Sequence, residues 1–179
     1  MAKPTGGTRN YSSKPKTLAK RRSQFDALVA TGSYRDYMFA ESGGYFIIHK
    51  EHLDVDNEKT KERFAAQSLA EHGYRAFLMP DSSYVEGFKK SDGFIERTEM
   101  DIKTINNAGN WTIHKALREA SKQGAGIAVL VQNTKEMTKD YVTAQLDSFR
   151  KSADGKHNET LKAVWIISMD GKRIHKRII

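Results

Sequence analysis

The chain has 179 residues, which suffice for one ordinary folded domain and are too few for two. Its 30 Lys and Arg against 22 Asp and Glu give a formal net charge of +8 and a pI near 9.6, a balance typical of nucleic-acid-binding proteins, although anionic membranes also attract such a chain. Cysteine is absent, which excludes disulfides, thiolate metal sites and a cysteine nucleophile. No apolar run has the length of about twenty residues that a membrane span requires, and the first residues lack the apolar stretch of a secretory signal peptide. We therefore expect a protein without a signal peptide or membrane association, which stays in the cytoplasm or leaves by a route that uses no cleaved signal.

The N-terminal region divides into two parts. Residues 1–22 are rich in Gly, Ser, Lys and Arg and contain almost nothing apolar, so we predict a disordered basic tail that attracts phosphates; a tag or linker role is the alternative. Residues 23–42 are predicted to be a short helical lead-in, because apolar residues recur at helical spacing over 23–31. The folded domain is expected over 43–179.

Within this domain, apolar patterns and turn residues predict the order of the elements. Strands are expected over 45–48, 74–79, 93–97, 99–105, 127–131, 161–168 and 173–178, and helices over 57–73, 107–123 and 138–151. The central stretch therefore reads helix, strand, strand, strand, helix, strand. This order predicts an α/β fold with a mixed central sheet flanked by helices.

One predicted strand carries charged residues on a single face. Glu99, Asp101 and Lys103 alternate with Met100 and Ile102, so the charged side chains point to one side and the apolar ones to the other. A strand with a core-like side and a charged side either lines a cleft or forms an exposed hairpin. Two further Asp-x-Lys patterns, at Asp154 and Asp170, are interpreted as turns.

Asp92 lies at the start of the preceding strand, where a hairpin would bring it close to Asp101. Two adjacent carboxylates repel, and a divalent cation such as Mg²⁺ resolves this by taking both as oxygen ligands. Such a cation polarises a phosphate and lowers the pKa of a bound water, while Lys103 would orient that water or stabilise the transition state. These groups suit phosphodiester hydrolysis. The alternative for Asp92 is a turn residue before Gly93.

Glu62 is a further candidate, because it shares a helix face with the apolar residues that should pack on the sheet. A glutamate on that face needs a partner, either the cation or Lys103, unless it lies exposed at the edge of the helix. His52, His49 and His72 are interpreted as surface histidines, and His114 as an exposed helical one.

Polar and basic residues around the helix over 107–123 are candidates for binding nucleic acid. The free N–H groups of a helix N-terminus attract phosphate, and basic residues three and four apart form a stripe, although capping and an ordinary solvated face explain the same residues. The candidates are Asn106, Asn107, Thr112, Lys115, Arg118 and Lys122.

Four segments resemble a known family: GGYFIIHKEH over 43–52, LAEHGY over 69–74, SD over 91–92 and MDIKTINN over 100–107. The chain is similar there to the CdiA C-terminal tRNase domain, the toxin module of contact-dependent growth inhibition. The likeness covers about residues 43–179. It implies a restriction-endonuclease-like, PD-(D/E)XK fold, with tRNA as substrate, an immunity protein as partner, and the cytoplasm of the producing or target cell as location.

Matched by motif, the resemblance gives each acidic or basic residue of the site a counterpart. Asp92 corresponds to the first aspartate, Asp101 to the second acid, Lys103 to the lysine and Glu62 to the helix glutamate. One departure is Ser91, which stands where the family has a proline that stiffens the strand entry.

We therefore expect a metal-dependent endoribonuclease of the tRNA-cleaving toxin type. Two alternatives stay open. One is a metal-independent RNase that uses His114 as a general base, and the other is a non-catalytic nucleic-acid-binding protein of a phage or mobile element.

Overall fold

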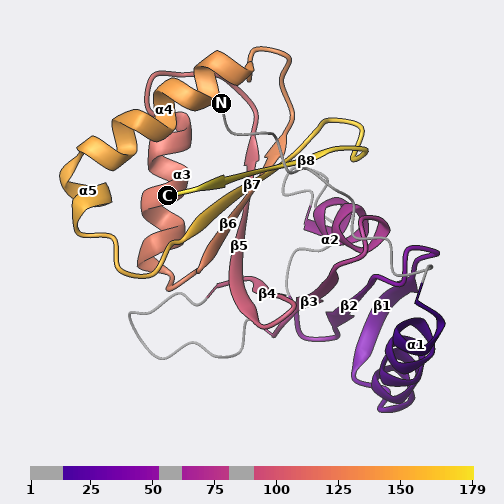
Figure 1. The fold of residues 1–179 in the computed structure, drawn as a ribbon. Coiled ribbons are helices and arrows are strands. Elements are labelled where there is room, and N and C mark those ends of the chain that lie inside the picture. The colour runs from indigo at the N-terminus through magenta and orange to yellow at the C-terminus, as the bar shows by residue number, and fades with distance from the viewer. Residues whose placement is uncertain (1–13, 53–61, 81–90) are drawn as a thin grey trace.

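The computed structural model describes residues 14–52, 62–80 and 91–179, and these form a sheet with helices on both sides (Figure 1). Eight strands lie in the order of the chain: β1 Tyr34–Phe39, β2 Tyr45–His49, β3 Arg75–Leu78, β4 Gly93–Ile95, β5 Thr98–Ile105, β6 Ile127–Gln132, β7 Ala163–Ile167 and β8 Ile174–Ile178. The helices are α1 Pro15–Ala30, α2 Glu62–Glu71, α3 Thr112–Lys122, α4 Lys139–Lys151 and α5 Ala153–Lys156. The predicted mixed α/β sheet is confirmed.

The sheet is mixed because crossover helices alternate with hairpins. β2–β3, β5–β6 and β6–β7 are parallel pairs, joined through α2, α3 and α4. The other four neighbouring pairs are antiparallel. None of the helices in the described part of the chain is long and apolar enough to cross a membrane.

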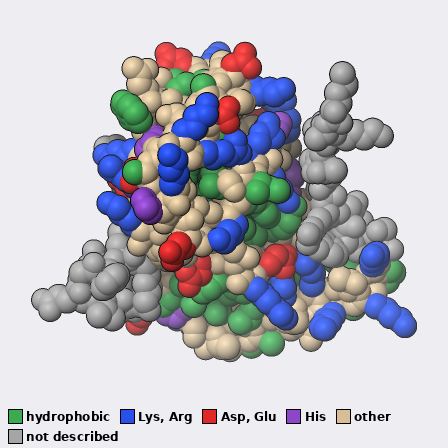
Figure 2. Space-filling view, turned by 60° about the vertical axis from the view of Figure 1, so that its left-hand side comes forward, with side chains coloured by type: hydrophobic (Ala, Val, Ile, Leu, Met, Phe, Trp, Pro, Cys, Tyr) green, Lys and Arg blue, Asp and Glu red, His purple; other side chains and the backbone are tan. Residues whose placement is uncertain are grey.

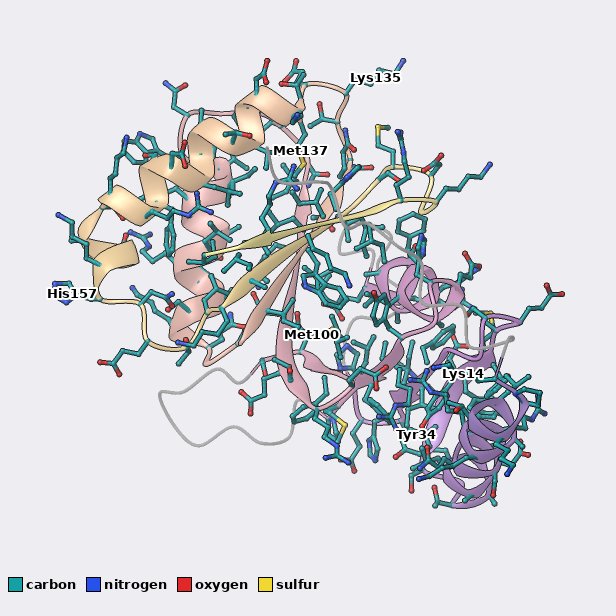
Figure 3. The ribbon with its side chains drawn as sticks, viewed as in Figure 1. Lys14, Tyr34, Met100, Lys135, Met137 and His157 are labelled. Carbon is teal, nitrogen blue, oxygen red and sulfur yellow. The ribbon has the colours of Figure 1, made fainter. Side chains whose placement is uncertain are left out.

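Two apolar cores lie on opposite faces of the sheet. On one face, α2 packs its Leu69 over Phe46, Met100 and Ile102. Figure 3 labels Met100 at the end of β5 that lies beside β4. On the other face, α3 and α4 cover a second core that includes Ile105 of the same strand. The alternation predicted for β5 is confirmed, and it points Asp101 and Lys103 away from α2.

Local sequence signals account for several boundaries. The hydroxyl of Thr138 accepts a hydrogen bond from the amide of Tyr141 at 3.2 Å and so caps the N-terminus of α4, where the helix was predicted to begin. Gly73 and Gly124 follow α2 and α3 with φ of 84° and 79°, a left-handed conformation that glycine adopts without strain.

The N-terminal region differs from the prediction. α1 begins at Pro15 rather than near residue 23, so a disordered tail is wrong for residues 14–22; residues 1–13 lie outside the described part. β1 pairs with β2, so the sheet begins before residue 43. At the other end of the chain, residues 153–156 form the short helix α5 instead of a turn.

Arg21 explains why α1 is part of the fold. Its side chain is buried and donates hydrogen bonds to the carbonyl oxygens of Gly43 at 3.2 Å and Gly73 at 2.8 Å. The guanidinium also lies 3.2 Å from the carboxylate of Glu96, which pairs with Arg75 as well. These partners lie far away in the sequence, so composition alone suggested a solvated basic tail.

Replacing Arg21 with Ala should lower the free energy of unfolding by about 3 kcal/mol, because two buried carbonyls and one carboxylate lose a charged donor. Arg22→Ala is the matched control. Arg22 is exposed and pairs with Asp26, so its loss should cost about 1 kcal/mol or less. Urea unfolding measures both. Equal effects of the two substitutions would show that Arg21 does not anchor the helix.

Candidate functional site

The site lies beside β5, at the point where β4 ends and β6 continues along the other edge of β5. We call this point, with Asp92, Asp101 and Lys103, the fork. β6 pairs with β5 over residues 100–105, whereas β4 pairs with it only over residues 98–100. Beyond Met100, no described strand pairs with β5 on the β4 side. Asp92, directly before β4, closes this gap: its Oδ2 accepts a hydrogen bond from the amide of Ile102 at 2.6 Å. Its backbone oxygen accepts another from the amide of Met79 at 3.1 Å.

Asp101 and Lys103 form a buried ion pair on the next part of β5. The Asp101 residue is 0% exposed, and the ammonium of Lys103 lies 2.9 Å from its Oδ1 and 2.8 Å from its Oδ2. The Lys103 side chain is 20% exposed, so the pair reaches the surface through the lysine. An exposed hairpin with a solvated charged face is therefore excluded for Asp101, while Glu99 near the strand's start is exposed.

The charge state of Lys103 follows from its neighbours. Burial alone would lower the pKa of Lys103, but the charge and hydrogen bond of Asp101, followed by the charges of Asp92 and Glu119, outweigh it and raise the pKa. Lys103 is therefore an ammonium at neutral pH. It can donate hydrogen bonds and offset negative charge, but it cannot act as a base.

Glu62 is held by a histidine. Its Oε2 lies 2.6 Å from Nε2 of His52, whose Nδ1 lies 2.6 Å from the carbonyl oxygen of Met79. His52 is only 2% exposed, so its interpretation as a surface histidine was wrong. Because the Met79 amide also donates to Asp92, a short series of hydrogen bonds connects Glu62 to the fork.

The other predicted residues lie around α3. Asn107 accepts hydrogen bonds from the Thr112 hydroxyl at 2.8 Å and the Gly109 amide at 3.2 Å, so it stabilises the turn before α3; the N-cap residue of the helix is Trp111, and no side chain caps it. Asn106 accepts one from Asn133 at 2.7 Å. These contacts shape the turn before α3 and join it to the end of β6.

The basic residues of α3 lie at its surface. Lys115 is 4.0 Å from Glu119, and Arg118 and Lys122 line a pocket that His157 and Asp154 complete. Figure 2 shows Lys and Arg side chains spread over the face that comes forward there, with acidic side chains between them. His157 points outward beyond α5 (Figure 3).

His114 differs from the prediction. It is 7% exposed rather than exposed, and its Nε2 lies 3.2 Å from the carboxylate of Asp154. Its ring packs edge-on against Trp111 and Phe149. These contacts place His114 between α3 and the α4–α5 segment, where it joins helices.

The fork fits one kind of cation site. Among the described residues, no group of three or more His, Asp or Glu could hold a metal ion. Mg²⁺ commonly keeps several waters and takes one or two carboxylates together with substrate phosphates. Asp92 and Asp101 fit such a site, in which the cation would share the Asp101 carboxylate with Lys103.

Comparison with known proteins adds one likeness. No family model and no curated protein matches the chain. Among solved structures, the chain is similar to the CdiA-CT/CdiI toxin and immunity complex from Burkholderia pseudomallei, with 22% identity and a TM-score of 0.49 over 70% of this chain and 89% of that chain.

The raised pKa of Lys103 predicts how stability depends on pH. Lys103→Met should lower the free energy of unfolding at pH 7 by about 3 kcal/mol, because the buried Asp101 carboxylate loses its ammonium. A raised folded-state pKa stabilises the fold below the unfolded value, which is about 10.4 for lysine, and this stabilisation disappears as the pH rises through the folded value.

Urea unfolding of wild type and Lys103→Met should therefore differ by a constant amount from pH 7 to pH ~10 and converge above it. The Asp101→Asn/Lys103→Met double variant is the control, since removing both charges should recover part of the loss. A difference that vanishes between about pH 7 and 9 would show that the ammonium does not stabilise the site.

Proposed function

We propose that the chain is a nuclease that hydrolyses phosphodiester bonds in RNA, using a divalent cation at the fork. The observation that carries this proposal is the buried Asp101–Lys103 pair directly beside Asp92. Buried ion pairs contribute little to stability compared with apolar residues of the same size. A pair placed where a sheet opens, next to a second carboxylate, therefore supports a functional role.

Each residue has a role that its geometry allows. Asp92 and Asp101 would hold Mg²⁺ or a similar ion, which when bound polarises a phosphate and lowers the pKa of a water ligand. Lys103, kept as an ammonium by Asp101, offsets the negative charge that develops on the phosphoryl oxygens. Glu62, held by His52, completes the set that the family resemblance implies.

The substrate and the biological setting follow from the resemblance. It implies tRNA as the RNA, a toxin role, and an immunity protein as partner. The chain's net charge of +8 suits RNA binding, and the basic residues at the surface of α3, Lys115, Arg118 and Lys122, would contact phosphates. His114 packs among helices, so its surroundings favour the cation-dependent reaction over an RNase with this histidine as base.

Asp101→Asn tests the reaction, because it keeps the shape of the side chain while removing the charge that holds the cation. RNA cleavage should fall by at least about a hundredfold. The matched control is Asp147→Asn, an exposed aspartate on α4 that should leave cleavage unchanged. Total RNA and plasmid DNA are incubated with each variant in Mg²⁺ and in EDTA, and melting temperature reports folding.

Three outcomes would overturn the proposal. Asp101→Asn could cleave as well as wild type, cleavage could persist in EDTA, or wild type could bind RNA without cleaving it under any divalent cation. The last outcome would identify a nucleic-acid-binding protein.

Binding to RNA should depend on salt. With Asp101→Asn as the inactive form, each phosphate contact should contribute about −0.7 to the slope of log affinity against log salt. Lys122→Ala should make this slope less steep by about that amount, because it removes one contact. Lys172→Ala, on the turn between β7 and β8, is the control. Identical slopes for all three proteins would exclude Lys122 from the contacts to phosphate.

A further inference from the structure

His52 is fixed in the fold from three sides. Its carbonyl oxygen accepts a hydrogen bond from the guanidinium of Arg35 at 2.7 Å, and its amide donates to the carbonyl of His49 at 3.0 Å. Its ring nitrogens lie 2.6 Å from the Met79 carbonyl oxygen and 2.6 Å from Glu62 Oε2. The side chain is 1% exposed and that of Glu62 is 12% exposed, so Glu62 alone of the two reaches solvent.

These two contacts determine where the protons are. A carbonyl oxygen can only accept, so Nδ1 of His52 must carry a hydrogen. A neutral histidine protonated at Nδ1 can only accept at Nε2, and an ionised carboxylate can also only accept. Two acceptors do not approach to 2.6 Å without a proton between them, and this separation is typical of a charge-assisted hydrogen bond.

We propose that His52 and Glu62 share one proton, either as imidazolium and carboxylate or as imidazole and carboxylic acid, and that His52 is the positioning residue for Glu62 in the reaction at the fork. The catalytic part of this inference rests on the proposed nuclease function; the shared proton does not. In both forms the pair is neutral overall, which lets it lie buried between β2, α2 and β3.

The pair is also coupled to Asp92. Met79 accepts from His52 with its carbonyl oxygen and donates to the backbone oxygen of Asp92 with its amide. His52 therefore orients Glu62 by a direct hydrogen bond and steadies Asp92 through one residue of backbone. Residues that hold a reacting side chain by a hydrogen bond, without touching the substrate themselves, commonly lower activity by about 10- to 100-fold when they are replaced.

The shared proton is tested first, by NMR of the histidine ring nitrogens and the Glu62 carboxyl carbon at pH 7. The expected result is a proton on Nδ1 of His52, together with either a proton on Nε2 or a protonated Glu62. Glu62→Gln should leave His52 neutral. A bare Nδ1, or a neutral His52 beside an ionised Glu62, would overturn the proposal. This readout does not depend on whether the protein cleaves RNA.

The positioning role is tested with two substitutions that each keep one of the two hydrogen bonds. In the His52→Gln variant, the new side-chain amide can replace Nε2 and donate to the Glu62 carboxylate. In the His52→Asn variant, the shorter amide can replace Nδ1 and donate to the Met79 carbonyl oxygen. We expect His52→Asn and Glu62→Gln each to lower kcat for RNA cleavage at least about tenfold, with KM unchanged. His52→Gln should retain most of the activity.

His72→Gln is the control, because this histidine contacts only backbone oxygens, those of Ser68 and Lys172, in the described part of the chain. Equal losses in His52→Gln and His52→Asn, or wild-type cleavage by a folded His52→Asn, would overturn the positioning role. Should His52→Asn fail to fold, retained activity in His52→Gln supports the role and its loss overturns it. An inactive wild type would refute the nuclease function, and the NMR result would still decide the shared proton.

Discussion

The architecture of the site depends on the length of β4. This strand pairs with only three residues of β5, the last of them Met100, whereas β6 pairs with β5 for five residues beyond Met100. A backbone amide left at such an edge needs an acceptor, and Asp92 supplies one to Ile102 through its side chain. The carboxylate is therefore held at the fork by the need to complete the sheet. The same hydrogen bond brings the Asp92 carboxylate beside Asp101, which is the first residue of β5 that no longer pairs with β4.

The charges at the fork are unequal. Asp92 and Asp101 contribute two carboxylates against the single ammonium of Lys103, whereas a shared proton would make the His52–Glu62 pair neutral. An excess of negative charge in a partly buried site attracts a cation and repels a nucleic acid until the cation is bound. The basic residues of α3 lie on the surface of that helix, so under the proposed function the attraction to RNA and the attraction to a cation would come from separate parts of the molecule.

Periodic features of the sequence predicted much of this structure. The alternation in β5 assigned Met100 and Ile102 to one core and Asp101 and Lys103 to the other face, and Thr138 marked the start of α4. The hairpin that brings Asp92 to Asp101 also followed from local patterns. In each case, the residues that determine the strand face, the helix start or the hairpin lie within a few positions of it in the sequence.

The parts that could not be predicted involve buried polar side chains with distant partners. Arg21 is neutralised by Glu96, 75 residues away, so a basic segment became part of a packed helix. His52 is bonded to Met79, 27 residues away, and His114 to Asp154, 40 residues away, so both histidines are buried where a solvated position was expected. Whether such a polar side chain is buried depends on a hydrogen-bond or ion-pair partner elsewhere in the sequence, and residue type and local spacing do not predict that partner.

Paramagnetic broadening by Mn²⁺ tests the cation site at the fork most directly. Mn²⁺ has the same preference for oxygen ligands as Mg²⁺, and it broadens the amide signals of residues close to the bound ion. Substoichiometric Mn²⁺ should first broaden the amides of Gly93, Asp101 and Ile102, and Asp101→Asn should abolish this selectivity. Broadening that begins at exposed acidic residues such as Asp147, or that is unchanged in Asp101→Asn, would contradict a cation site built by Asp92 and Asp101.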